Sequence, residues 1–298
     1  MDNKYLSHIF EGTLAGETLD EILFVSTLTA PAIDPQLIKS IHHDFVAIFT
    51  GSHPFFQKNT LPYHNLRHSQ MVVLATVRLF HGLHCNNVNI SEKTLLKGLL
   101  AAYFHDTGML LLKNDNARSE AEYLTNHEAR SILFLKQYCS HKGLSSDIAK
   151  DAATIINYTN FTRDPATFNQ HNDEIQLAGR VVGSADILSQ MADRYYLECL
   201  PLLFNEQNAG NICQHNSALE LMEHTANFYY NVVSKRLVST FSNTSYALQT
   251  HFFNRYTLDK NLYIENIDKN ILYLKKVIKA CRDIDCLNTY LRRRPPVI

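Results

Sequence analysis

The sequence predicts an all-α fold, because apolar residues recur at helical spacing along most of the chain while alternating strand patterns are scarce. The ten glycines and eight prolines fall mostly between these helical segments, where such residues mark turns and helix ends. No internal repeat or linker divides the chain, and 298 residues can bury an ample hydrophobic core. We therefore predict a single compact multi-helix domain over residues 1–298.

Two helices are predicted in the first part of the chain. Asp34 can cap the free N–H groups of a helix that begins with Pro35, and apolar residues then recur at helical spacing through Phe49. A loop around residues 51–54 follows. Pro62 is then expected to open the next helix, because proline fits a first helical turn.

Later helices are predicted by the same signals. Ser91 can cap a helix that ends at the adjacent residues His105 and Asp106, just before Gly108. Glycine in that position suits the left-handed turn that stops a helix. Further helices are predicted over roughly 121–138, 145–159, 175–200, 218–238 and 261–278, with a loop at 160–173.

Charge and composition exclude several functional classes. The formal net charge is −1, which provides no electrostatic footprint for a nucleic-acid polymer or an anionic membrane. No stretch approaches the ~18 apolar residues of a membrane span, and the N-terminus lacks the basic start and apolar run of a signal peptide. The six dispersed cysteines form no C-x-x-C pair, which favours reduced thiols in a cytoplasmic protein.

Histidine and aspartate residues in three segments have the chemistry of a metal site. His64 and His68 are four residues apart, so a helix opened by Pro62 would project both from one face. The adjacent His105 and Asp106 lie at a predicted helix end. Imidazole and carboxylate groups are ligands for hard or borderline divalent metals.

Asp186 is the expected closing ligand of this site. The small residues Gly183 and Ala185 precede it and permit close helix approach. Alone, each residue has an ordinary structural explanation, since histidines occur in cores and on surfaces and a lone aspartate can be a buried, hydrogen-bonded group. The combination predicts a metal site that is shared by the side chains of His68, His105, Asp106 and Asp186.

Charge balance favours two ions over one. Two divalent cations against the two aspartates, Asp106 and Asp186, would leave a charge of about +2, which can hold a phosphodiester and a hydroxide together. A single divalent cation would leave about zero and little attraction for phosphate. Such a site makes water nucleophilic at neutral pH, as phosphate-ester hydrolysis requires.

With these residues identified, the chain resembles the HD-domain superfamily of metal-dependent phosphohydrolases. The segment Pro62-Tyr63-His64-Asn65-Leu66-Arg67-His68 is especially similar to the signature of cyclic-nucleotide phosphodiesterase catalytic domains. The resemblance covers about residues 60–200. It implies an HD-type, phosphodiesterase-like helical bundle there, with helical extensions over 1–59 and 201–298 packed on it.

The resemblance also implies roles for individual residues. His68, His105, Asp106 and Asp186 correspond to metal ligands, and His64 corresponds to the acid that protonates the departing alkoxide. An imidazole that titrates near neutrality can donate such a proton. Asp106 would bridge two divalent ions (magnesium, manganese, iron or zinc), and a water or hydroxide between them would attack phosphorus.

Three further polar residues form a looser group. His127 could approach the second metal or its waters, although a solvent-facing or core histidine is an equal explanation. Glu128 could orient a ligand histidine, or it could simply lie exposed. Asn65 is expected to support the helix and the histidines rather than react.

The leading functional prediction is cleavage of a nucleotide phosphodiester, with a cyclic mononucleotide as the first candidate. The glutamine and paired apolar clamp that grip a purine in the cyclic-nucleotide enzymes have no counterpart that the sequence identifies. A nucleotide phosphomonoesterase is the alternative enzyme, because the same metals could perform that reaction. A non-catalytic metal- or nucleotide-binding module is the alternative of another class. In each case the partner is a small phosphate ester, and the chain could form a homo-oligomer.

Overall fold

The computed structural model describes residues 15–293 and confirms the all-α prediction. Within that range the regular elements are helices and helical turns, and the one β-type contact is an isolated bridge between Phe56 and Leu112. The first fourteen residues of the predicted N-terminal extension lie outside the described residues, and with them the stretch judged to lack a signal peptide. The last five residues also lie outside.

Twelve α-helices follow one another along the described chain. In order they are α2 (Ala15–Thr29), α3 (Pro35–Thr50), α4 (Leu66–Cys85), α5 (Glu92–Phe104), α6 (His127–His141), α7 (Ser146–Ile156), α8 (Asp173–Ala192), α9 (Tyr196–Ala209), α10 (Ala218–Phe228), α11 (Ala247–Tyr256), α12 (Leu262–Ala280) and α13 (Ile284–Tyr290). Short turns join them: 3₁₀ turns at Thr107–Met109, Glu120–Tyr123, Asn157–Thr159, Pro165–Gln170 and Thr244–Tyr246, and π turns at Tyr229–Val233 and Arg236–Thr240.

Several helix boundaries form as the sequence predicts. Asp34 accepts a hydrogen bond from the backbone N–H of Gln36 at the start of α3, which has proline in its first turn. Ser91 accepts from the N–H of Thr94 at the start of α5. At the other end of α3, Gly51 adopts a left-handed conformation with φ 75°, which glycine tolerates best.

Two local predictions are wrong. Pro62 does not open a helix, because Asn65 has an extended backbone and its side chain accepts from the N–H of His68, so that α4 begins only at Leu66. His64 therefore precedes the helix, and the expected one-turn relationship with His68 does not exist. Gly108 does not adopt a left-handed conformation either; it lies within a 3₁₀ turn.

Other boundaries differ more modestly. The helix expected over 175–200 is two helices, because Asp193 has an extended backbone (φ −60°, ψ 137°) that ends α8 before α9 begins. The predicted segment at 121–138 is a 3₁₀ turn followed by α6. The segment at 218–238 is α10 followed by two π turns, and α11 and α13 were not predicted as separate helices.

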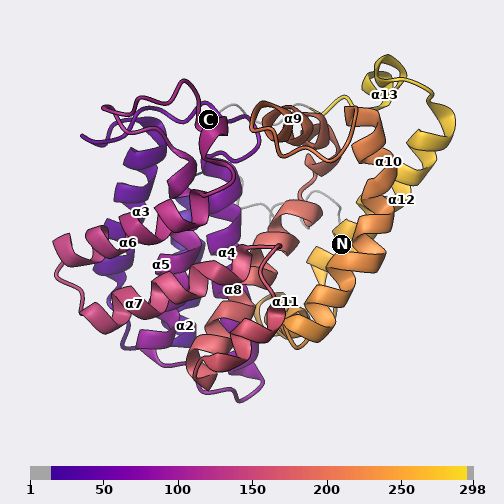
Figure 1. Cartoon of the computed structure of the whole chain (residues 1–298). Coiled ribbons are helices and arrows are strands. Elements are labelled where there is room, and N and C mark those ends of the chain that lie inside the picture. The colour runs from indigo at the N-terminus through magenta and orange to yellow at the C-terminus, as the bar shows by residue number, and fades with distance from the viewer. Residues whose placement is uncertain (1–14, 294–298) are drawn as a thin grey trace.

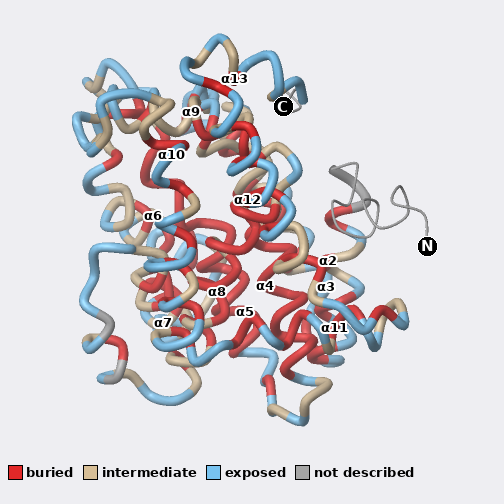
Figure 2. The backbone as a smooth tube through the Cα atoms, turned by 90° about the vertical axis from the view of Figure 1, so that its right-hand side faces the viewer, coloured by how far each residue is buried: buried red, intermediate tan, exposed pale blue. Residues whose placement is uncertain are grey.

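Helices α4 and α8 pack against each other at the centre of the fold. Helix α5 packs on both of them, α11 packs on α4, and α12 packs on α8 (Figure 1). In Figure 2 the tube through α4, α5 and α8 is almost continuously buried. One cluster of buried apolar side chains extends from Ile22 in α2 to Leu287 in α13, so helices from both ends of the described chain share this core.

Two of the six cysteines differ from the sequence prediction. Cys281 and Cys286 form a disulfide, because the chain reverses between α12 and α13 and brings their Cα atoms within 5.3 Å. The prediction of six reduced thiols is therefore wrong for this pair. The other four cysteines are free: Cys85, Cys139, Cys199 and Cys213. None of the described helices is both long enough and apolar enough to cross a membrane.

Candidate metal centre

The four predicted ligands come together where three central helices meet. His68 lies in the first turn of α4, His105 and Asp106 directly follow α5, and Asp186 lies in the middle of α8. Because α4, α5 and α8 all pack against one another, side chains that are more than 100 residues apart in the sequence share one small volume.

The distances between these side chains are short. His68 Nε2 lies 3.3 Å from Asp186 Oδ1 and 3.5 Å from Asp106 Oδ2. His105 Nε2 lies 3.2 Å from Asp106 Oδ2 and 3.7 Å from Asp186 Oδ1. Ligand atoms of His68, His105 and Asp106 lie within 4.8 Å of one another. Asp186 is not part of that group of three, but its Oδ1 lies beside both imidazoles.

The hydrogen bonding of His105 shows that these residues fit a cation. Its Nδ1 lies 2.9 Å from the carbonyl oxygen of Ala102, which assigns an N–H to Nδ1 and leaves Nε2 facing Asp106. Both residues are buried, 2% and 4% exposed, and neither His105 Nε2 nor Asp106 Oδ2 has a hydrogen-bond partner among the described residues. Buried polar atoms are normally paired, so this nitrogen and this carboxylate oxygen share either a proton or a metal ion.

The pKa values of Asp106 and His105 also indicate that the cluster favours positive charge. Burial alone would raise the pKa of Asp106. The charge and hydrogen bond of His105, with the charges of His64 and His68, outweigh burial and hold the pKa well below its usual value. Burial alone would lower the pKa of His105, but Asp106 and Asp186 raise it to about 9. The site therefore attracts positive charge strongly.

His127 lies on the other side of the Asp106 carboxylate. Its Nδ1 lies 2.8 Å from the carbonyl oxygen of Leu124, and its Nε2 lies 3.9 Å from Asp106 Oδ1. Asp106 thus presents one oxygen to the His68 and His105 side and the other to His127. Glu128 lies beside the far nitrogen, with its Oε2 3.5 Å from His127 Nδ1, so it borders the imidazole rather than Asp106.

His64 is held by a residue that the sequence analysis missed. Glu206 in α9 is buried, and its Oε2 lies 2.6 Å from His64 Nδ1. The other carboxylate oxygen accepts from the backbone N–H of Tyr63 at 2.6 Å. Burial opposes protonation of His64, but the hydrogen bond and charge of Glu206, aided by Asp106, raise its pKa above the usual value.

No local signal in the sequence identifies Glu206. It is 142 residues from His64 along the chain, in a polar stretch that would suit an exposed helix end. The His64 segment is fixed from its N-terminal side as well: Asn59 donates to the carbonyl oxygen of His64, and the buried Glu120 accepts from the backbone and hydroxyl of Thr60.

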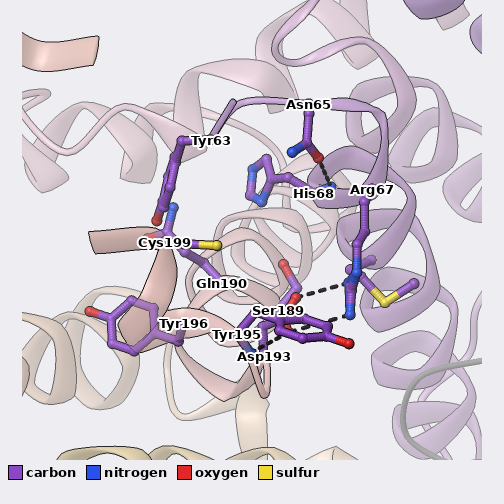
Figure 3. Close-up of a pocket in the computed structure, with 11 residues that line it drawn as sticks. Tyr63, Asn65, Arg67, His68, Ser189, Gln190, Asp193, Tyr195, Tyr196 and Cys199 are labelled. Carbon is purple, nitrogen blue, oxygen red and sulfur yellow. Dashed lines mark hydrogen bonds and ion pairs between the residues drawn. The ribbon is translucent and has the colours of Figure 1, made fainter. Parts of the chain in front are cut away.

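A small cavity of about 40 Å³ adjoins His68. Figure 3 shows Tyr63 and Cys199 on one side of His68 and Arg67 on the other. The Arg67 guanidinium is already paired with Asp193 at 2.9 Å. Residues at the start of α4, at the end of α8 and at the start of α9 complete the lining: Asn65, Met71, Ser189, Gln190, Tyr195 and Tyr196.

Asn65 has the supporting role that the sequence predicts. Its side-chain oxygen caps α4 at the N–H of His68, and its amide donates to the carbonyl oxygen of Pro62 at 2.8 Å. The residue thus fixes the step from the His64 segment into the helix that carries His68.

Comparison with known proteins gives one family similarity. The family described as Npun_R2479-like matches residues 109–253, just under half of the chain. The matched segment contains Asp186 and Glu206 but begins after His64, His68 and the His105–Asp106 pair. No curated protein matches the chain. The chain is therefore similar, over α6 to α11, to a family whose description names no activity.

Proposed function

We propose that the protein is a metal-dependent phosphohydrolase and that its preferred reaction is cleavage of a nucleotide phosphodiester. The observation that carries the proposal is the close approach of two buried atoms, His105 Nε2 and Asp106 Oδ2, which lie 3.2 Å apart and, among the described residues, have no hydrogen-bond partner outside the cluster. His68 and Asp186 lie around the same point. This set of two imidazoles and two carboxylates suits magnesium, manganese, iron or zinc.

The arrangement around Asp106 supports a second ion. His127 approaches Asp106 Oδ1, the oxygen that His68 and His105 leave free. Asp106 would therefore be the shared ligand of two ions. Bound divalent ions would neutralise phosphate charge and lower the pKa of water, which is the chemistry that phosphate-ester hydrolysis needs.

In this proposal His64 is the general acid. Glu206 occupies Nδ1, so Nε2 is the nitrogen available to donate a proton to the leaving oxygen. Glu206 raises the pKa of His64 above its usual value and so favours the protonated imidazole, the form that donates. Glu206 also fixes the ring, since the same carboxylate is anchored on the backbone of Tyr63.

The leaving group provides the test of this role. His64→Gln should lower turnover of an alkoxide-leaving phosphodiester by about 10²–10⁴-fold, the usual contribution of a positioned acid. The loss should be much smaller with a nitrophenyl phosphodiester, whose leaving group needs little protonation. Metal content should not change. His84→Gln is the matched control, because His84 is exposed near the other end of α4.

The substrate class needs a separate comparison. Product analysis on a cyclic mononucleotide beside a nucleoside monophosphate separates a phosphodiesterase from the phosphomonoesterase alternative. Binding of metal and nucleotide without turnover of either substrate would contradict the proposal and identify a binding module. A cytoplasmic location, expected from the sequence, belongs to the same proposal, and cell fractionation tests it. Light scattering tests whether the chain forms the homo-oligomer that the sequence leaves open.

A further inference from the structure

A side chain outside the candidate ligand set holds the turn that carries Asp106. Ser131 lies on α6 and is completely buried. Its hydroxyl donates to the carbonyl oxygen of His105 at 2.6 Å and accepts from the backbone N–H of Gly108 at 2.8 Å. These two backbone groups flank Asp106, so one hydroxyl fixes the chain on both sides of it.

The turn and α6 are in unusually close contact. A Cβ atom on Gly108 would lie 1.9 Å from the carbonyl oxygen of His127 and 2.5 Å from the backbone nitrogen of Ser131. Only glycine allows this approach without a shift of the backbone. Arg130 strengthens the contact, because its guanidinium donates to the carbonyl oxygens of Gly108 and Leu110 at 2.7 and 3.1 Å.

We propose that Ser131 is a positioning residue of the metal centre: its hydroxyl fixes the backbone around Asp106 and thereby the direction in which both carboxylate oxygens point. The inference rests on the proposed function only for the metal ions, not for hydrolysis. Groups that orient metal ligands without touching the metal commonly contribute about 10–100-fold to metal affinity.

The position of Ser131 also relates the two sides of Asp106. His127 and Ser131 are four residues apart in α6, so they lie on one face of the helix. A shift of α6 would therefore move His127 relative to Asp106 Oδ1 and would also release the turn that aims Oδ2 at His68 and His105. Through Ser131 and His127, the surroundings of both carboxylate oxygens of Asp106 depend on the position of α6.

Metal titration of the full-length protein tests this role. Ser131→Ala should weaken binding of manganese or zinc to the metal-depleted protein by about 10–100-fold, as measured by calorimetry or chelator competition. Ser26→Ala is the matched control, because Ser26 is equally buried but lies on α2. It should bind metal as the wild type does. Thermal unfolding of both metal-free variants separates a loss of affinity from a loss of folding. Wild-type affinity in a folded Ser131→Ala protein would overturn the inference.

Hydrogen exchange on the wild type provides a second test that needs no substitution. The Gly108 amide, which donates to Ser131, should exchange several-fold more slowly once metal ions bind, because ions held by Asp106 oppose opening of the turn. An exchange rate that metal leaves unchanged would contradict the coupling. A wild type that binds no metal would overturn both proposals, whereas one that binds metal without hydrolysis would overturn the hydrolase alone.

Discussion

Helix α4 carries two histidines whose neighbouring charges are opposite: one lies beside carboxylates, and the other lies near arginines. Near its N-terminus, His68 lies among the carboxylates of Asp106 and Asp186. Near its C-terminus, His81 meets His251 of α11, and their Nδ1 atoms are 3.2 Å apart. His68 is half-buried, whereas His81 and His251 are buried, and the charges around the two regions also differ.

The pKa values follow those charges. In the first region Asp106 overcomes the effect of burial and raises the pKa of His105 to about 9. In the second, burial and the charge of Arg255 lower the pKa of His81 to about 4. Burial and Arg78 hold the pKa of His251 well below its usual value. Carboxylates surround one group of histidines with negative charge, while burial, aided by Arg255 and Arg78, keeps the other pair neutral.

Removal of the Asp106 charge should have the largest effect. Asp106→Asn keeps the shape of the side chain but removes the carboxylate from the centre of the cluster. We expect metal affinity to fall by more than about 100-fold and metal-dependent turnover to be lost, as measured by metal content and phosphate-ester hydrolysis. Asp151→Asn is the control, because Asp151 pairs with Lys97 away from the cluster. Normal metal content in a folded Asp106→Asn protein would contradict the shared-ligand role.

Acid should act mainly on the neutral histidines. The folded-state pKa of His81 and that of His42 are lowered to about 4, below the unfolded value of about 6.5. Stability is therefore complete above pH 6.5 and is lost as the pH falls toward 4, by about 2 kcal/mol per histidine at pH 5.

Urea unfolding of the metal-free protein at pH 7 and pH 5 measures this effect. His81→Gln should reduce the difference between the two pH values, and the exposed His84→Gln should leave it unchanged. A pH difference that His81→Gln leaves as large as in the wild type would show that the fold does not hold His81 neutral.

Alanine substitutions at two glycines should have different effects in the two regions: one should lower stability, and the other should lower metal affinity. A Cβ at Gly82 would lie 1.8 Å from the carbonyl oxygen of Ala247, where α4 meets α11. Gly82→Ala should cost about 1–3 kcal/mol of stability and leave metal affinity unchanged. Gly108→Ala should lower metal affinity instead, because it forces α6 away from the turn at Asp106. Thermal unfolding and metal titration of both variants measure this difference. Equal losses of metal affinity in the two variants would contradict it.

Loss of the helix cap beside the candidate centre should have the smallest effect. Asn65→Ala removes the acceptor for the N–H of His68 and should destabilise the protein by about 1 kcal/mol. Asn65→Asp, which keeps the capping oxygen, should restore stability. Chemical denaturation compares the three proteins. An Asn65→Ala protein as stable as the wild type would show that Glu206 and Asn59 alone hold the segment before α4.

Local signals account for what could be predicted. Asp34 and Ser91 act as caps because capping needs only a side chain and the next helical turn. The start of α4 was placed too early because Asn65, not Pro62, decides it. The candidate ligands could be chosen from their chemistry, since imidazole and carboxylate groups recur in short motifs.

Residues that act through packing left no such signal. Glu206 and Ser131 each contact the candidate centre from another helix, 142 and 26 residues away from their partners in the sequence. Nothing near either residue indicates which partner it meets, because the contact exists only once α9 and α6 have packed. The Cys281–Cys286 pair was likewise decided by the reversal between α12 and α13.

The most direct measurement is turnover of phosphate esters by metal-depleted protein after resupply with manganese, magnesium, iron or zinc. The panel includes cyclic mononucleotides, cyclic dinucleotides and nucleoside monophosphates, with Asp106→Asn as the control for contaminating enzymes. We predict hydrolysis that depends on added metal, favours a phosphodiester and disappears in the variant. No turnover of any substrate by protein with confirmed metal occupancy would contradict the proposed phosphohydrolase.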